Sequence, residues 1–166
     1  MEAPQPSVSA QDLALISAQI GRSARGVVGI AARCAGGHPN VVRTAPRLAD
    51  GTPFPTLYYL TCPAAVAAVS TLESQGVMRQ MTDALEQDPD LADAYRAAHQ
   101  HYLAARAELG EVPEIASVSA GGMPTRVKCL HALVAHSLAA GPGVNPLGDR
   151  ALQLLAPEWR PERCTA

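Results

Sequence analysis

The chain has 166 residues, of which 48% are hydrophobic and 4% aromatic, so we expect a globular core built mainly from Ala, Leu and Val. Thirteen basic and fifteen acidic residues give a net charge of -2, and the absence of a basic tract argues against a nucleic-acid-binding surface. No apolar stretch reaches the roughly 20 residues that span a bilayer, and residues 1–25 lack the pattern of a secretory signal. The sequence therefore predicts a cytoplasmic protein without a membrane segment.

The first part of the chain predicts one helix and then three strands. Residues 1–8 are expected to be disordered. Ser9 and Asp12 resemble a weakened capping box at the start of a helix that Gly21 ends. Segments rich in β-branched and aromatic residues, typical of strands, follow at 26–34, 41–45 and 56–60. Their close spacing predicts an antiparallel sheet of about three strands.

The second part of the chain is predicted to be mainly helical. Residues 114–124 are expected to form a short strand or extended segment that runs into a glycine loop. Pro124 is expected to begin a further helix, which Gly141 ends. Caps, prolines and apolar spacing predict the remaining helices at 63–73, 77–87, 89–109 and 146–155. We therefore expect an α+β fold, in which the small sheet of the N-terminal half packs against a mostly helical C-terminal part.

This pattern predicts one α+β domain over residues 9–156, followed by a C-terminal tail over residues 157–166.

The stretch RVKCLHALVAH, residues 126–136, holds the chain's single lysine together with one cysteine and two histidines. If the whole stretch is helical, Cys129 and His136 share a face but lie about 10 Å apart along the axis. His131 would then lie on the opposite side of the helix. The helix alone therefore predicts no metal chelate, and the alternative is a core helix with a buried cysteine.

A metal site would need ligands from several elements. In the cytoplasm the four well-separated cysteines would be thiols, metal ligands or core residues, because disulfides are rare there. No C-x-x-C motif occurs, but strand and helix ends could bring thiolates together around zinc or an iron–sulfur cluster. Such a site requires Cys129 to face the strand end that carries Cys62. The candidate ligands are Cys34, Cys62, Cys129, His38, His131 and His136.

The second candidate is an anion site. Gly121 and Gly122 precede the predicted start of a helix, and Arg126 and Lys128 lie just inside it. Free backbone N–H groups and the helix dipole attract anions at such a position, so a phosphorylated small molecule is the candidate partner. The alternative is a plain turn with solvated charges. No reaction can be named from these residues, and whether the protein is an enzyme is left open.

A third interpretation is a protein-interaction module. The predicted helix over residues 89–109 would expose four basic side chains outside its apolar stripe, and the alternative is a solvated helix face. These side chains are Arg96, His99, His101 and Arg106.

Three segments resemble a bacterial family known as domain of unknown function 501. They read DGTPFPTLYYLTCP, SAGGMPTRVKCLHALVAHSLA and GVNPLGD, and the resemblance extends over about residues 21–155. It implies no established activity. Genes of the family often lie beside those for a septum-formation initiator and an exopolyphosphatase. The resemblance therefore implies that any protein partner would act in cell division.

The resemblance also bears on the metal hypothesis. Many members of the family carry Cys-Pro-Cys-Gly where this chain has Cys-Ala-Gly-Gly at residues 34–37. Gly36 therefore stands in place of a second cysteine. Either one ligand is lost, or His38 replaces it, or the turn needs no metal.

Overall fold

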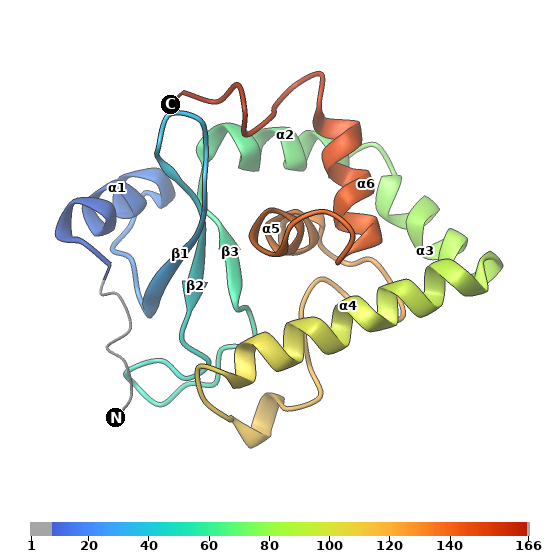
Figure 1. Ribbon diagram of the computed structural model, residues 1–166, viewed down its shortest axis with the longest axis horizontal. Helices are drawn as coiled ribbons and strands as arrows, with labels where there is room; N and C mark the ends of the chain where they lie inside the picture. The colour runs from blue at the N-terminus through green and yellow to red at the C-terminus, as the bar shows by residue number, and fades with distance from the viewer. Residues whose placement is uncertain (1–7, 166) are drawn as a thin grey trace.

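The computed structural model describes residues 8–165 and has an α+β fold, as predicted (Figure 1). The predicted disordered segment 1–8 lies outside the described residues, apart from Val8. Within the described range no helix is both long and apolar enough to cross a membrane. The elements in chain order are α1 (Ala10–Ile20), β1 (Val27–Arg33), β2 (Pro39–Thr44), β3 (Tyr58–Leu60), α2 (Pro63–Glu73), α3 (Val77–Gln87), α4 (Pro89–Ala107), the 3-10 helix η1 (Pro113–Ile115), α5 (Leu130–Ala140) and α6 (Pro146–Leu155).

The three strands form one antiparallel sheet in the order β1-β2-β3, which confirms the prediction. Successive side chains of a strand point to opposite faces, and both faces of this sheet are covered. Val42 and Tyr59 lie on the face toward α1, while Val41 and Leu60 join the main core on the face toward α5. Figure 1 shows α1 and α5 on opposite sides of the strands.

Helix α5 is the centre of the helical part. In Figure 1 it is seen end-on, with the sheet on one side and α2, α4 and α6 around it. Leu130, Leu133, Val134 and Ala135 are fully buried. A mainly apolar helix is stable when it is enclosed in this way. Helix α5 is therefore largely part of the core, whereas Cys129, which the core-helix alternative expected to be buried, precedes the helix and is half-buried.

The start of this helix was predicted wrongly. Helix α5 begins at Leu130 and not at Pro124, because the chain before it folds back on itself. The carbonyl of Gly121 accepts hydrogen bonds from the backbone N–H groups of Lys128, at 2.7 Å, and Cys129, at 3.3 Å. The predicted short strand within residues 114–124 is also absent, since this described segment forms η1 and a series of turns. Helices α2, α3 and α6 have the predicted bounds.

The tail after α6 packs against the body of the protein. Trp159 and Cys164 are buried. The backbone N–H groups of Ala35 and Gly36 donate to the carbonyls of Pro161 and Cys164, at 2.9 and 3.0 Å. These bonds hold the tail against the turn between β1 and β2.

Candidate functional site

Glu73, Cys129 and His131 form a mixed cluster where the end of α2 meets the start of α5. One potential ligand atom from each lies within 4.8 Å of the other two. Within the described residues 8–165, it is the one group of at least three His, Cys, Asp or Glu side chains whose ligand atoms lie close enough together to hold a metal ion. Cys129 and His131 belong to the predicted ligand set, whereas Glu73 was not predicted.

Cys129 reaches His131 because it precedes the helix. Its backbone is extended, with φ −151° and ψ 113°, and it occupies the N-cap position of α5. The prediction that the two side chains lie on opposite sides assumed helical backbone at Cys129. Outside the helix that angular relation no longer holds, so the thiol can turn back toward the imidazole of the first helical turn.

Glu73 connects the two helices. Its Oε2 accepts a hydrogen bond from the backbone N–H of Leu130 at 2.8 Å, and its Oε1 lies 3.3 Å from Nδ1 of His131. A carboxylate is unfavourable at the C-terminal end of its own helix, α2, but favourable at the N-terminal end of α5. Glu73 therefore stabilises the junction between α2 and α5, and its Oε1 is directed toward His131.

The far side of the His131 ring is also held. Nε2 lies 3.2 Å from Oγ of Ser70 and 3.3 Å from the carbonyl oxygen of Val66. A ligating histidine commonly donates its second ring N–H to such an oxygen, which sets both the tautomer and the ring orientation. This arrangement leaves Nδ1 facing Glu73.

The cluster favours the reactive form of the thiol. Its hydrogen bond with His131 lowers the pKa of Cys129, and this effect exceeds that of burial, which raises it. The same hydrogen bond raises the pKa of His131 despite burial, and the charge of Glu73 adds to the rise. A thiolate is the form of cysteine that binds metals and attacks electrophiles.

The cluster is accessible from solvent. The side chains of His131 and Glu73 are 26% and 22% exposed, and Cys129 is half-buried. The cluster therefore lies at the edge of the core, with all three residues partly exposed.

The other predicted metal ligands lie in different surroundings. The Sγ atom of Cys62 is 3.8 Å from Sγ of Cys164, and burial raises the pKa of Cys62. Cys34 is part of the core, and Nδ1 of His38 is buried without a hydrogen-bond partner in the described structure.

His136, the last of the predicted metal ligands, is fully buried. Its Nε2 lies 3.0 Å from Nδ1 of His101, and its Nδ1 lies 3.1 Å from Nδ2 of Asn145. Of the six candidates, the mixed cluster thus contains Cys129 and His131.

The glycine loop has a structural explanation. Gly121 and Gly122 have φ values of 67° and 93°, in the left-handed region that favours glycine. A Cβ atom on Gly122 would lie 2.7 Å from the carbonyl oxygen of Arg126. The N-terminus of α5 is already occupied by the Glu73 carboxylate. Anion binding by Arg126 and Lys128, whose side chains are exposed, stays a prediction.

The predicted basic face of α4 is only partly exposed. Arg96 and His101 are exposed, but His99 and Arg106 are buried. Nδ1 of His99 lies 2.7 Å from Oγ of Ser119, and Arg106 donates to the carbonyls of Pro55 and Ile115. The prediction of exposed side chains was therefore wrong for His99 and Arg106, because both bind the loops that cover α4.

Comparison with models of protein families matches residues 30–153 to the family described as "Protein of unknown function (DUF501)". Comparison with curated proteins and with solved structures found no match.

Proposed function

Because the chain belongs to the DUF501 family, whose description assigns no activity, we propose a function from its own residues: it binds a divalent transition metal through Glu73, Cys129 and His131. The observation that supports this proposal is the convergence of a thiol, an imidazole and a carboxylate within 4.8 Å. Zinc accepts all three ligand types in one site. An iron–sulfur cluster fits less well, because it is usually held by four thiolates and this group contains one cysteine.

The spacing suits one tetrahedral ion. Zinc bond lengths of about 2.0–2.3 Å place neighbouring ligand atoms roughly 3.4–3.8 Å apart. The three side chains therefore need only small rotations to close around an ion. The Ser70 hydroxyl and the Val66 carbonyl are already placed to hold the opposite side of the His131 ring.

Three protein ligands leave one tetrahedral position for water or a substrate, as in catalytic zinc sites. A metal held there would supply Lewis-acid chemistry. The thiol ligand needs a reducing compartment, so we place this function in the cytoplasm.

The predicted anionic partner is part of the proposal. The side chains of Arg126 and Lys128 are exposed and make no ion pair or hydrogen bond within residues 8–165. They precede Cys129 by three residues and by one residue, and we propose that they bind an anionic group on a substrate held at the open position.

Cobalt substitution tests the metal site. Metal-free, reduced protein is titrated with Co²⁺ without oxygen, and the absorption spectrum is recorded. We expect saturation at about one equivalent, with a thiolate-to-cobalt band in the near ultraviolet and visible bands of a tetrahedral ion. The Cys129→Ser variant should lose the thiolate band, and His131→Asn should weaken binding.

The matched control is Cys34→Ser, which removes a buried thiol outside the cluster. It should keep both the band and the stoichiometry. Wild-type protein that takes up no cobalt or zinc, or a Cys129→Ser variant with an unchanged spectrum, would contradict the proposal.

A further inference from the structure

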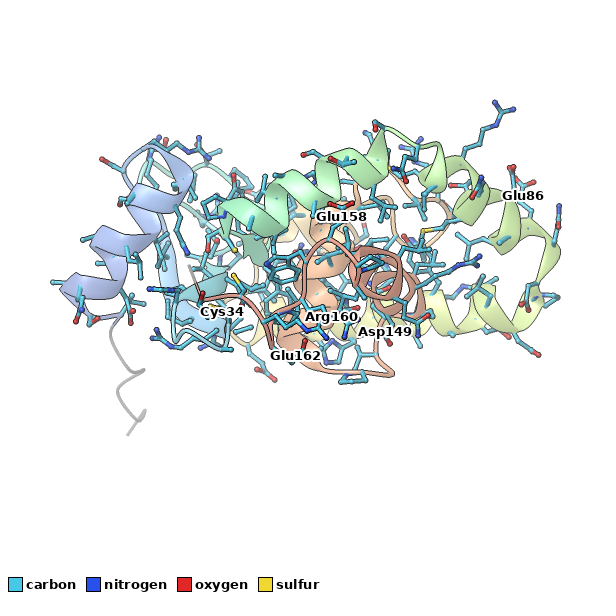
Figure 2. The ribbon with its side chains drawn as sticks, turned by 90° about the horizontal axis from the view of Figure 1, so that it is seen from above. Cys34, Glu86, Asp149, Glu158, Arg160 and Glu162 are labelled. Atoms are coloured by element: carbon cyan, nitrogen blue, oxygen red, sulfur yellow. The ribbon has the colours of Figure 1, made fainter. Side chains whose placement is uncertain are left out.

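A cavity of about 150 Å³ lies between α1, the face of the sheet toward α1 and the loop over residues 45–57, and we call it the α1 pocket. None of its lining residues belongs to the Glu73–Cys129–His131 cluster. Figure 1 shows α1 and α5 on opposite sides of the sheet, and Figure 2 shows α1 at one end of the molecule. The α1 pocket is therefore separate from the proposed metal site.

The wall of the α1 pocket is mainly apolar. Ile20, Val27, Leu48, Phe54 and Tyr59 line it, and each of these side chains is only partly buried. They come from α1, from β1 and β3, and from the loop between β2 and β3. Apolar side chains that stay partly exposed around one hollow are typical of a binding site for a small molecule.

The size of the α1 pocket suits a single ring. An apolar cavity of about 150 Å³ holds a molecule such as benzene. Two aromatic side chains, Phe54 and Tyr59, are part of the wall, and aromatic rings favour edge-to-face or offset contacts with another ring. The interior therefore suits one six-membered aromatic ring and is too small for a nucleotide.

The charged side chains at the α1 pocket are positive. Within the described part of the chain, Arg22 and Arg25 line it and no Asp or Glu does. Arg25 lies 3.6 Å from the carboxylate of Asp50, whereas Arg22 makes no ion pair within residues 8–165. Nη2 of Arg22 donates to the hydroxyl of Tyr59 over a long 3.4 Å, which places the guanidinium beside the apolar wall. Arg22 is therefore the cation available to a ligand.

Ser23 adds donors beside Arg22. It lines the α1 pocket and is exposed, and neither its backbone N–H nor its hydroxyl makes a hydrogen bond within residues 8–165. A guanidinium binds a carboxylate through two parallel N–H donors, and such bonds are stronger than those between neutral groups. These groups favour an anion at the solvent side of the pocket and disfavour an ammonium group.

We propose that the α1 pocket binds a small aromatic carboxylate, a molecule with one ring and one carboxylate group, of which benzoate is the simplest. The ring lies among the apolar side chains and contacts Phe54. The carboxylate accepts hydrogen bonds from the guanidinium of Arg22. The hydroxyl of Tyr59, which accepts from Arg22, has its own proton to donate to the same carboxylate.

Titration of the ¹⁵N-labelled full-length protein with benzoate, followed by NMR, tests this proposal. We expect saturable shift changes of the backbone amides at residues 22–27 and 54, with a dissociation constant below about 1 mM. Benzamide has nearly the same shape without the charge, and acetate has the charge without the ring. Each should bind at least about tenfold more weakly than benzoate.

Two variants test the two halves of the ligand. Arg22→Gln removes the cation from an exposed side chain, so it should fold normally and bind benzoate about tenfold more weakly. Phe54→Leu keeps an apolar wall without the ring and should weaken binding severalfold. Arg79→Gln, on the exposed surface of α3, is the matched control and should bind like wild type. Figure 2 labels Glu86 of the same helix at the opposite end of the molecule from α1.

Absence of saturable shift changes at the α1 pocket up to about 20 mM benzoate would overturn the proposal. Equal affinities for benzoate and benzamide would also overturn it, because the contact with Arg22 would then contribute nothing. The same holds if the folded Arg22→Gln variant binds benzoate as tightly as wild type.

Discussion

The carboxylate of Glu73 accepts a hydrogen bond from the backbone N–H of Leu130 at 2.8 Å, although 57 residues separate the two in sequence. This bond satisfies one of the N–H groups that a helix leaves unpaired in its first turn. It also holds the carboxylate beside Nδ1 of His131. One side chain thus supports the start of α5 and completes the mixed cluster.

Substitution of Glu73 should separate these two contributions. Glu73→Ala removes the acceptor for Leu130 and should lower the free energy of unfolding by about 1–2 kcal/mol. Glu73→Gln keeps an acceptor oxygen, so its loss of stability should be about half as large or less. Both variants should bind Co²⁺ at least about tenfold more weakly. Urea denaturation and cobalt titration measure the two effects, and Glu73→Gln with wild-type cobalt affinity would remove Glu73 from the ligand set.

The thiol of Cys129 should react at lower pH than an ordinary cysteine. Its pKa is lowered by the hydrogen bond with His131, so the thiolate persists as the pH falls below the usual cysteine value of about 8.5. Alkylation by iodoacetamide, followed by peptide mass spectrometry at each pH, gives the profile. His131→Asn should move the profile of Cys129 to higher pH, whereas His38→Asn should leave it unchanged. Identical profiles for wild type and His131→Asn would show that the pair does not interact.

His136 should make the fold sensitive to acid. Burial, and then the neighbouring His101, lower the pKa of His136 to about 4, below the unfolded value of about 6.5. The neutral ring therefore contributes stability above pH 6.5, and this contribution is lost as the pH falls through 6.5 toward 4. The loss should be about 3 kcal/mol.

Urea denaturation between pH 7 and pH 4 measures this effect. His136→Gln should be less stable than wild type at pH 7, because Asn145 and His101 lose their partner. Its stability should fall less steeply toward pH 4. Parallel pH curves for the two proteins would exclude His136 as the source of acid sensitivity.

Gly148 should be essential for the contact between α5 and α6. A Cβ atom at this position would overlap the carbonyl oxygen of Leu133 and Oγ of Ser137. The carbonyl belongs to helical backbone, so the overlap can be relieved only by a shift of the helices. Gly148→Ala should therefore lower the free energy of unfolding by about 2–3 kcal/mol. Thermal or chemical denaturation measures the loss.

Gly29→Ala is the matched control for this prediction. The three heavy atoms nearest to its Cβ would all belong to the guanidinium of Arg43, the mobile end of a flexible side chain, so the cost should stay below about 1 kcal/mol. Equal stability of Gly148→Ala and Gly29→Ala would contradict the packing argument.

The sequence predicted those elements whose ends carry local signals. Asn145 caps α6 through its side chain, and Pro63 begins α2 at a position where the missing N–H is harmless. The true start of α5 has no such signal. The turn before it is held by Thr82, which accepts from the N–H of Val127, and by Tyr95, which donates to the carbonyl of Arg126. These contacts come from α3 and α4, so local spacing could not reveal them.

The candidate site was predictable only in part for the same reason. Cys129 and His131 were predictable candidates, because thiolates and imidazoles are common metal ligands. Glu73 is an ordinary acidic residue at a helix end, and only the packing of α2 against α5 gives it a special position. The error over the angle between Cys129 and His131 followed directly from the error over where α5 begins.

The tail after α6 and helix α1 extend the packed body of the protein beyond the segment shared with the family. The family match ends at residue 153, yet the carbonyls of Pro161 and Cys164 bind the turn at Ala35 and Gly36, inside the matched segment. At the other end, the buried Ile16 precedes the match. Trimming the protein to residues 30–153 would remove Ile16, Trp159 and Cys164 from the interior, so the minimal autonomous fragment should be drawn from these contacts and not from family boundaries.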